Sequence, residues 1–132
     1  MTVIAVDTNR FSNTFKHEYE PALAYCREQV ILNETNSGTY VLGTVLGKVT
    51  ATGKYKRVES SAVDGSQTAI AILTQDVTFV ANTDKSVNVI ANGPATASKA
   101  GLFFGASVDT DAERNAAYDQ LRAVGIKTHN AI

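Results

Sequence analysis

The stretch from Gly38 to Asp76 constrains the fold most, because its apolar and β-branched residues come in short runs separated by glycines. The runs are interrupted at Gly43, Gly47, Gly53 and Gly65. Short β-branched runs with glycines at close backbone approaches are typical of tight β-structure, whereas a helix needs a longer periodic pattern. The stretch therefore predicts strands that are joined by tight turns.

Several segments rich in β-branched and aromatic residues are predicted to be the strands of one body. They are 24–32, 40–42, 44–51, 54–58, 68–73, 77–80 and 86–91. Thr52-Gly53 predicts a hairpin turn, and Asp64-Gly65 predicts the turn of a polar loop over 60–66. Asn92-Gly93-Pro94 is predicted to end the sheet region.

The C-terminal part of the sequence predicts a helix over 112–124. Thr110 and Glu113 have the spacing of a capping box at its start, and Gly125 suits a left-handed cap at its end. The apolar face of this helix is narrow and consists of Ala117, Leu121 and Val124. The helix is therefore expected to pack one face on the sheet, and the tail that follows to Ile132 is expected to be untied.

Composition indicates one soluble globular domain, since 44% of the 132 residues are hydrophobic and 19% are charged. A formal net charge of −1 argues against a protein that coats nucleic acid. The single cysteine, Cys26, excludes an intramolecular disulfide and fits folding in a reducing cytoplasm. No apolar run approaches the roughly 20 residues of a membrane span, and the run within 1–6 is too short for a secretory leader.

The first 20 residues form a polar segment with a few apolar side chains. Those side chains are Val3, Ile4, Val6, Phe11 and Phe15. One interpretation is a terminus that frays in solution. The other is an arm that becomes ordered against a partner by adding a strand to an exposed sheet edge. The expected α+β fold is thus a β-rich domain over 21–132, β-tulip-like or mixed β-barrel-like with one C-terminal helix, preceded by an extended N-terminal arm over 1–20.

No catalytic, cofactor-binding or metal-binding site is predicted. The segment 43–49 differs from a phosphate-binding loop, because three residues separate its glycines where the motif has four, and Val49 replaces the magnesium-binding Ser or Thr. The two histidines, His17 and His129, have no second ligand at a metal-binding spacing. Cys26 falls in a predicted strand and is expected to be a buried, inert thiol.

Four blocks of residues share their order and spacing with a known family. The central block is GTVLGKVT (43–50), followed by DGSQTA (64–69) and AIL (71–73). The flanking blocks are YEPAL (19–23) with CRE (26–28) and Val30, then NGPA (92–95), and finally LRAVGI (121–126). Over residues 19–126 this arrangement resembles the bacteriophage head decoration proteins, which are similar to lambda decoration protein D.

The resemblance implies a structural virion protein without enzymatic activity or cofactor. It implies a homotrimer, made in the host cytoplasm, that binds the outer surface of the expanded capsid at threefold and quasi-threefold positions and stabilises it. The implied partner is the phage major capsid protein, with no direct contact to nucleic acid or membrane. Because such proteins dock through an N-terminal arm, Val3, Ile4, Val6, Phe11 and Phe15 are the candidate capsid-binding residues.

Two functions of other classes remain as alternatives. A small β-rich ligand- or glycan-binding module would be monomeric or would bind a soluble ligand. An enzyme that uses Asp, Glu and Tyr would have a deep polar pocket. Within the decoration-protein hypothesis, the candidate trimer contacts are the loop 60–66 and the segment 93–95.

Overall fold

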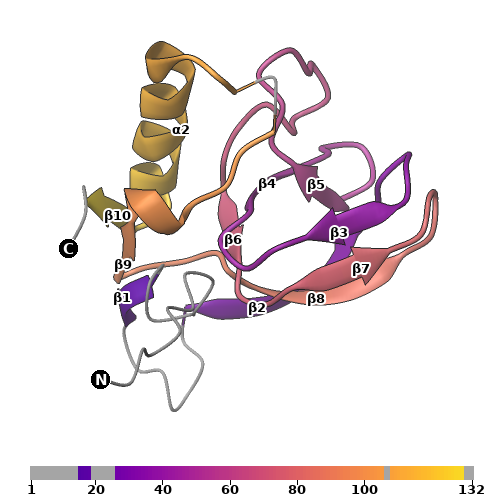
Figure 1. Cartoon of the computed structure of the whole chain (residues 1–132), viewed down its shortest axis with the longest axis horizontal. Coiled ribbons are helices and arrows are strands. Elements are labelled where there is room, and N and C mark those ends of the chain that lie inside the picture. Colours follow the sequence, from indigo (N-terminus) through magenta and orange to yellow (C-terminus); the bar gives the residue numbers. More distant parts are fainter. Residues whose placement is uncertain (1–14, 19–25, 106–107, 130–132) are drawn as a thin grey trace, which may run out of the picture.

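The computed structural model describes residues 15–18, 26–105 and 108–129. Its elements are shown in Figure 1 and are, in chain order, β1 (Phe15–Glu18), β2 (Arg27–Leu32), β3 (Gly38–Tyr40), β4 (Val45–Lys48), β5 (Tyr55–Arg57), β6 (Ala71–Leu73), β7 (Val77–Phe79), β8 (Lys85–Ile90), β9 (Ala95–Ser98), the 3-10 helix η2 (Lys99–Gly101), the α-helix α2 (Asp111–Ala123) and β10 (Ile126–His129).

Five strands close into a barrel in the order β2-β5-β4-β6-β8. The longest pairing is antiparallel, between β2 and β8, and runs from Arg27 opposite Ile90 to Leu32 opposite Lys85. The barrel closes through a short parallel contact between Leu32 of β2 and Tyr55 of β5. Closure gives every barrel strand a partner on each side, although β2 meets β5 at this one residue pair.

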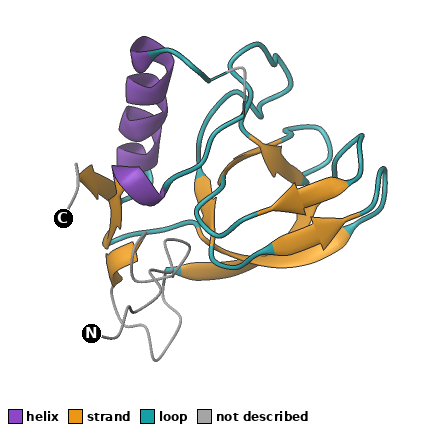
Figure 2. Cartoon of the chain, viewed as in Figure 1, coloured by secondary structure: helices purple, strands orange, loops and turns teal. Residues whose placement is uncertain are grey.

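Two smaller sheets lie outside the barrel. In the three-stranded sheet β1-β9-β10, the central strand β9 pairs antiparallel with β1 and parallel with β10. The other sheet is the antiparallel pair β3-β7. Helix α2 and the three-stranded sheet lie at one end of the long axis, and β3-β7 lies at the other end (Figures 1 and 2). The barrel lies between them.

Three barrel strands bury both of their faces. Neighbouring residues of a strand point to opposite sides, and in β4, β6 and β8 they belong to two separate apolar clusters. The pairs are Val45 and Leu46, Ile72 and Leu73, and Ile90 and Val89, all with 0% of their surface exposed. In β4 and β6 this two-sided burial explains the continuous apolar runs, whereas β8 alternates as far as Val89, with Ser86 and Asn88 exposed.

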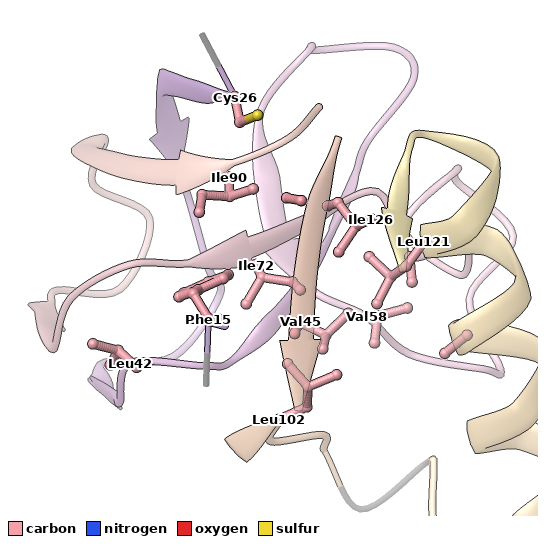
Figure 3. Packing of buried hydrophobic residues seen from close by; sticks show 14 of the residues in the cluster. Phe15, Cys26, Leu42, Val45, Val58, Ile72, Ile90, Leu102, Leu121 and Ile126 are labelled. Carbon is pink, nitrogen blue, oxygen red and sulfur yellow. The ribbon is translucent and has the colours of Figure 1, made fainter. Parts of the chain in front are cut away.

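The first cluster joins the barrel to the three-stranded sheet and the helix. Val45 and Ile72 of the barrel lie near Phe15 of β1, Leu121 of α2 and Ile126 of β10 (Figure 3). The second cluster joins the barrel to the β3-β7 sheet. Its members include Leu32, Leu46, Leu73, Val87, Val89, Tyr40, Val77 and Phe79.

The predicted α+β, β-rich fold with a C-terminal helix is confirmed. Helix α2 begins as expected, because the Thr110 hydroxyl accepts a hydrogen bond from the Glu113 amide at 3.2 Å. Gly125 has a positive φ of 94°, which suits the left-handed position after a helix. Gly53 also has a positive φ, of 72°, in the turn between the antiparallel strands β4 and β5.

Two predictions about the sheet region were wrong. Asn92-Gly93-Pro94 does not end it, because β9 begins at Ala95, and the tail after Gly125 is tied down as β10. Both strands owe their structure to pairing with distant segments, which local β-propensity does not report. Cys26 is fully buried as predicted but precedes β2 instead of lying within it, and its thiol donates to the Pro94 carbonyl oxygen at 3.5 Å.

We expect Leu121→Ala to lower the free energy of unfolding by about 2–5 kcal/mol, because it leaves a cavity where α2 meets the barrel. Urea denaturation monitored by circular dichroism measures this loss. Val80→Ala is the control, since Val80 is 62% exposed and a surface truncation changes stability by no more than about 0.5 kcal/mol. Equal losses in the two variants would contradict the buried position of Leu121.

Candidate functional site

Strand β1 fixes the point at which the N-terminal segment joins the body. It is an outer strand of the three-stranded sheet, and among the described strands it pairs with β9. Phe15 lies opposite Ala97 and Glu18 opposite Ala95, with an irregular register between Phe15 and His17. Phe15 is only 5% exposed and packs in the first apolar cluster. Residues 15–18 are therefore part of the folded body.

An ion pair ties β1 to the barrel. The guanidinium Nε of Arg27, at the start of β2, donates to the two carboxylate oxygens of Glu18 at 3.2 and 3.0 Å, and Nη2 donates to Oε1 at 2.5 Å. Glu18 is 8% exposed, so its charge is compensated mainly by this forked contact. The hydrogen bond with Glu18 also raises the pKa of Arg27 above its ordinary value.

The candidate arm residues are divided by the structure. Phe15 lies in β1 and packs inside this chain's own core. Val3, Ile4, Val6 and Phe11 lie outside the described residues. The sequence pattern did not distinguish Phe15 from the others, because an apolar side chain in a polar segment has the same appearance whether it packs in its own core or against a partner.

The loop 60–66, a candidate trimer contact, is braced from several sides. The Asp64 carboxylate accepts from the Ser66 amide at 3.0 Å and from the Ser66 hydroxyl at 2.6 Å, and it forms an ion pair with Lys56 at 3.3 Å. The Thr50 amide donates to the Asp64 carbonyl oxygen at 2.9 Å. The hydrogen bonds from Ser66, followed by the Lys56 contact, lower the pKa of Asp64 to about 2.

The other candidate trimer contact, 93–95, lies largely within the body. Ala95 is 3% exposed and begins β9. A Cβ atom on Gly93 would overlap the Gly125 carbonyl oxygen, so the two glycines let the end of α2 approach this turn closely. Pro94 is the exposed residue of the segment.

A polar pocket at the β3-β7 end bears on the alternative functions. It has a volume of about 280 Å³ and is lined by residues that include Glu34, Tyr40, Arg57 and Glu59. The centres of the Phe79 and Tyr40 rings lie 4.5 Å apart, and the Arg57 guanidinium lies 5.0 Å from the centre of the Tyr40 ring. The Tyr40 ring therefore offers no open face on which a sugar could stack. Burial, followed by the hydrogen bond from the hydroxyl to Glu34, raises the pKa of Tyr40.

Within residues 15–18, 26–105 and 108–129, no group of three or more His, Cys, Asp or Glu side chains is arranged to hold a metal ion. His129 lies in β10, where it pairs with Ser98 of β9. In the same described part of the chain, no helix has the length and apolar character required to cross a membrane.

The fold and the anchored β1 define a small β-barrel protein whose N-terminal segment joins the body at the edge of a separate sheet. A family model of the bacteriophage lambda head decoration protein D matches residues 7–126, and this chain belongs to that family. It is therefore a structural protein of a phage virion, with capsid decoration as its role. A comparison with curated proteins gave no match.

The family match includes only part of the predicted arm. Phe11 and Phe15 fall within residues 7–126, whereas Val3, Ile4 and Val6 precede them. The residue blocks covered 19–126, and the family match extends this range toward the N-terminus as far as residue 7. It does not include the first apolar run of the chain.

We expect Glu18→Gln to lower the free energy of unfolding by about 1–3 kcal/mol, because it removes the charge that compensates Arg27 in the contact between β1 and β2. Hydrogen exchange should show faster exchange of the β1 amides. The matched control is Glu28→Gln, since Glu28 is exposed on β2 and its replacement should leave stability within about 0.5 kcal/mol. Unchanged exchange in β1 would contradict an anchoring role for the ion pair.

Asp64 should make stability depend on pH in the acid range. Its pKa of about 2 in the folded protein lies below the value of about 4 for an unfolded chain. The carboxylate therefore stabilises the fold above pH ~4, and this contribution is lost as the pH falls through ~2. The urea concentration at the unfolding midpoint should fall as the pH is lowered from ~4 to ~2, and it should fall less steeply in Asp64→Asn than in the unmodified protein. Coincident profiles would contradict the stabilised carboxylate.

Proposed function

We propose that this protein binds the outer surface of an expanded phage capsid as a homotrimer and stabilises the shell, without enzymatic activity or cofactor. Its partner is the major capsid protein, and it makes no direct contact with nucleic acid or membrane. The observation that carries the proposal is the match of residues 7–126 to the head decoration family. The protein is made in the host cytoplasm and ends on the outside of the virion.

The docking element in this proposal is the arm that precedes β1. The covalent chain passes from this arm directly into an outer strand that Phe15 and the Glu18–Arg27 pair hold on the body. An extended segment that starts from a fixed strand can add to an exposed sheet edge of a partner, with main-chain hydrogen bonds for affinity and side-chain pockets for specificity. Val3, Ile4, Val6 and Phe11 supply the apolar side chains.

A single arm would bind weakly. Each net hydrogen bond contributes about 1 kcal/mol, whereas ordering the backbone costs about 1–2 kcal/mol per residue. Hydrogen bonds alone therefore do not hold an arm. Burial of an apolar side chain adds roughly 1.5–3 kcal/mol, so two or three such side chains make binding favourable. In a trimer, the second and third arms then bind at a high effective concentration.

Preferential binding of the arm to the expanded shell would make attachment follow capsid maturation. A ligand shifts an equilibrium only toward the state that it binds more tightly. If the acceptor edge for the arm forms when the shell expands, the decoration protein binds the expanded shell and thereby stabilises it. Stabilisation then equals the difference in binding free energy between the two states of the shell, summed over the bound trimers.

We expect the triple variant Val3→Ser, Ile4→Ser, Val6→Ser to lose binding to expanded shells of the cognate capsid protein while its fold and oligomeric state stay unchanged. Co-sedimentation measures binding, and circular dichroism with analytical ultracentrifugation checks the free protein. A variant that lacks residues 1–14 should behave in the same way, because it retains β1. Val80→Ser is the control for loss of one apolar side chain from the described surface.

The outcomes separate the parts of the proposal. Loss of binding only in the arm variants supports docking through the arm. Binding by the arm variants at full strength contradicts the arm and assigns docking to the body. Absence of binding by the unmodified protein contradicts decoration of this shell.

A further inference from the structure

One open groove on the body combines aromatic walls with positive charge. It has a volume of about 410 Å³ and lies between α2 and the chain that follows η2. Its aromatic walls are Phe103, Phe104 and Tyr118, and Lys99 and Arg114 lie beside them together with the carboxylate of Asp109. Phe103 is 43% exposed, which is unusual for a side chain of this size.

The walls of this aromatic groove are held in place. The Phe103 amide donates to the Gly43 carbonyl oxygen at 3.0 Å, and its carbonyl oxygen accepts from the Val45 amide at 3.0 Å. The Lys99 ammonium lies 4.6 Å from the centre of the Tyr118 ring, and the Phe104 ring meets Tyr118 edge to face at 5.9 Å. The exposure of Phe103 therefore follows from a backbone that is fixed against β4.

Neither cation of the groove forms a salt bridge within the described chain, and Asp109 is the single carboxylate among the lining residues against two cations. The salt bridges found there involve other basic residues, and neither Lys99 nor Arg114 is among them. A segment that fits the aromatic groove should therefore carry an apolar side chain together with negative charge.

The loop over 59–66 has those properties. Val63 is 94% exposed, and Asp64 places a carboxylate next to it in the sequence, whereas Glu59 at the start of the segment lines the polar pocket at the β3-β7 end. The loop is rigid at its base, since the Thr50 amide, Ser66 and Lys56 all bind Asp64. Asp64 keeps 39% of its side chain exposed in the ion pair with Lys56. Because the loop is already ordered, docking it would cost little conformational entropy.

We infer that the aromatic groove receives the 59–66 loop of a neighbouring copy of this chain. The inference rests on the proposed homotrimer and identifies the surfaces that hold it together. Val63 packs against Phe103 of the neighbour, and the Asp64 carboxylate faces the side of the groove that carries Lys99 and Arg114. The two surfaces are different patches of the same molecule, so each copy binds one neighbour with its loop and the other with its groove. Such head-to-tail contacts close into a ring of three when successive copies are related by a threefold rotation.

Charge and burial favour a second copy over a different partner. The groove and the loop carry complementary charge and both present an apolar side chain that is exposed in the single chain. Joining them removes two exposed apolar groups at once and brings opposite charges together, which favours this pairing over like-charged alternatives. Because the pairing involves rim charges, raising the salt concentration should weaken it.

Cross-linking between two single-cysteine additions tests the contact. Val63→Cys and Phe103→Cys are made in separate copies that carry different tags, and the two are co-expressed and treated with a bismaleimide. Cys26 is fully buried, so the unmodified protein serves as the unreactive background. We expect covalent dimers that contain one copy of each variant, and no cross-link when either variant is present alone. Val80→Cys paired with Phe103→Cys controls for random collision.

Each outcome decides the inference. Cross-linking of Val63→Cys with itself would place the loops together and would overturn it. A trimer in analytical ultracentrifugation without mixed cross-links would overturn it as well, while leaving capsid decoration intact. A monomer at every concentration would contradict both the inferred contact and the proposed trimer. Binding to shells is measured separately, so the failure of decoration is seen independently.

A pair of charge substitutions tests the energetics without cross-linking. Val63→Lys should raise the dissociation constant of the trimer about tenfold or more, since it removes an apolar contact and places a positive charge beside Lys99 and Arg114. Val80→Lys, also on an exposed valine, should leave the constant unchanged. A Val63→Lys protein that stays trimeric but no longer binds shells would mean that the loop faces the capsid, and would overturn the inference.

Discussion

The burial of barrel strands on both faces is the constraint on which the rest of the structure depends. Val45 and Leu46 are neighbours in β4, yet they serve different apolar clusters, and neither has any exposed surface. A barrel with an apolar outer face must be covered. The sheet β1-β9-β10 and helix α2 cover one side, and β3-β7 lies against the other cluster. Strand β1, where the N-terminal segment joins the body, is thus held in place because its sheet covers the barrel.

This constraint determines how much of the fold the sequence could predict. Strands β4 and β6 were visible because two-sided burial leaves continuous apolar runs, and α2 was visible because Thr110, Glu113 and Gly125 act locally. Strand β9 was missed, since its sequence Ala-Thr-Ala-Ser has small side chains and little β-propensity. It is a strand because β1 and β10 pair with it, and such long-range pairing leaves no local pattern.

The candidate site was predictable to a smaller extent, for a related physical reason. The sequence placed Phe15 with Val3, Ile4, Val6 and Phe11, but the pairing of β1 with β9 brings Phe15 into the core. The Glu18–Arg27 pair gave no signal, because two opposite charges in one sequence neighbourhood are ordinary. Only the tertiary structure, which brings Glu18 of β1 to Arg27 at the start of β2, turns them into a partly buried contact. The role of the arm is a proposal from family membership, and the tertiary structure shows that the chain enters the body at β1.

In the proposed trimer, the contact between copies affects how well the arms bind the shell. An arm of marginal affinity would gain from its neighbours only while the trimer stays assembled, because effective concentration exists only within one assembly. The strength of the proposed contact between copies would therefore set how far the three arms act together on the shell. A contact made by ordered elements, such as a braced loop and a groove fixed against β4, needs little reorganisation to form. The free energy available from the arms can then be directed to the capsid rather than to assembling the trimer.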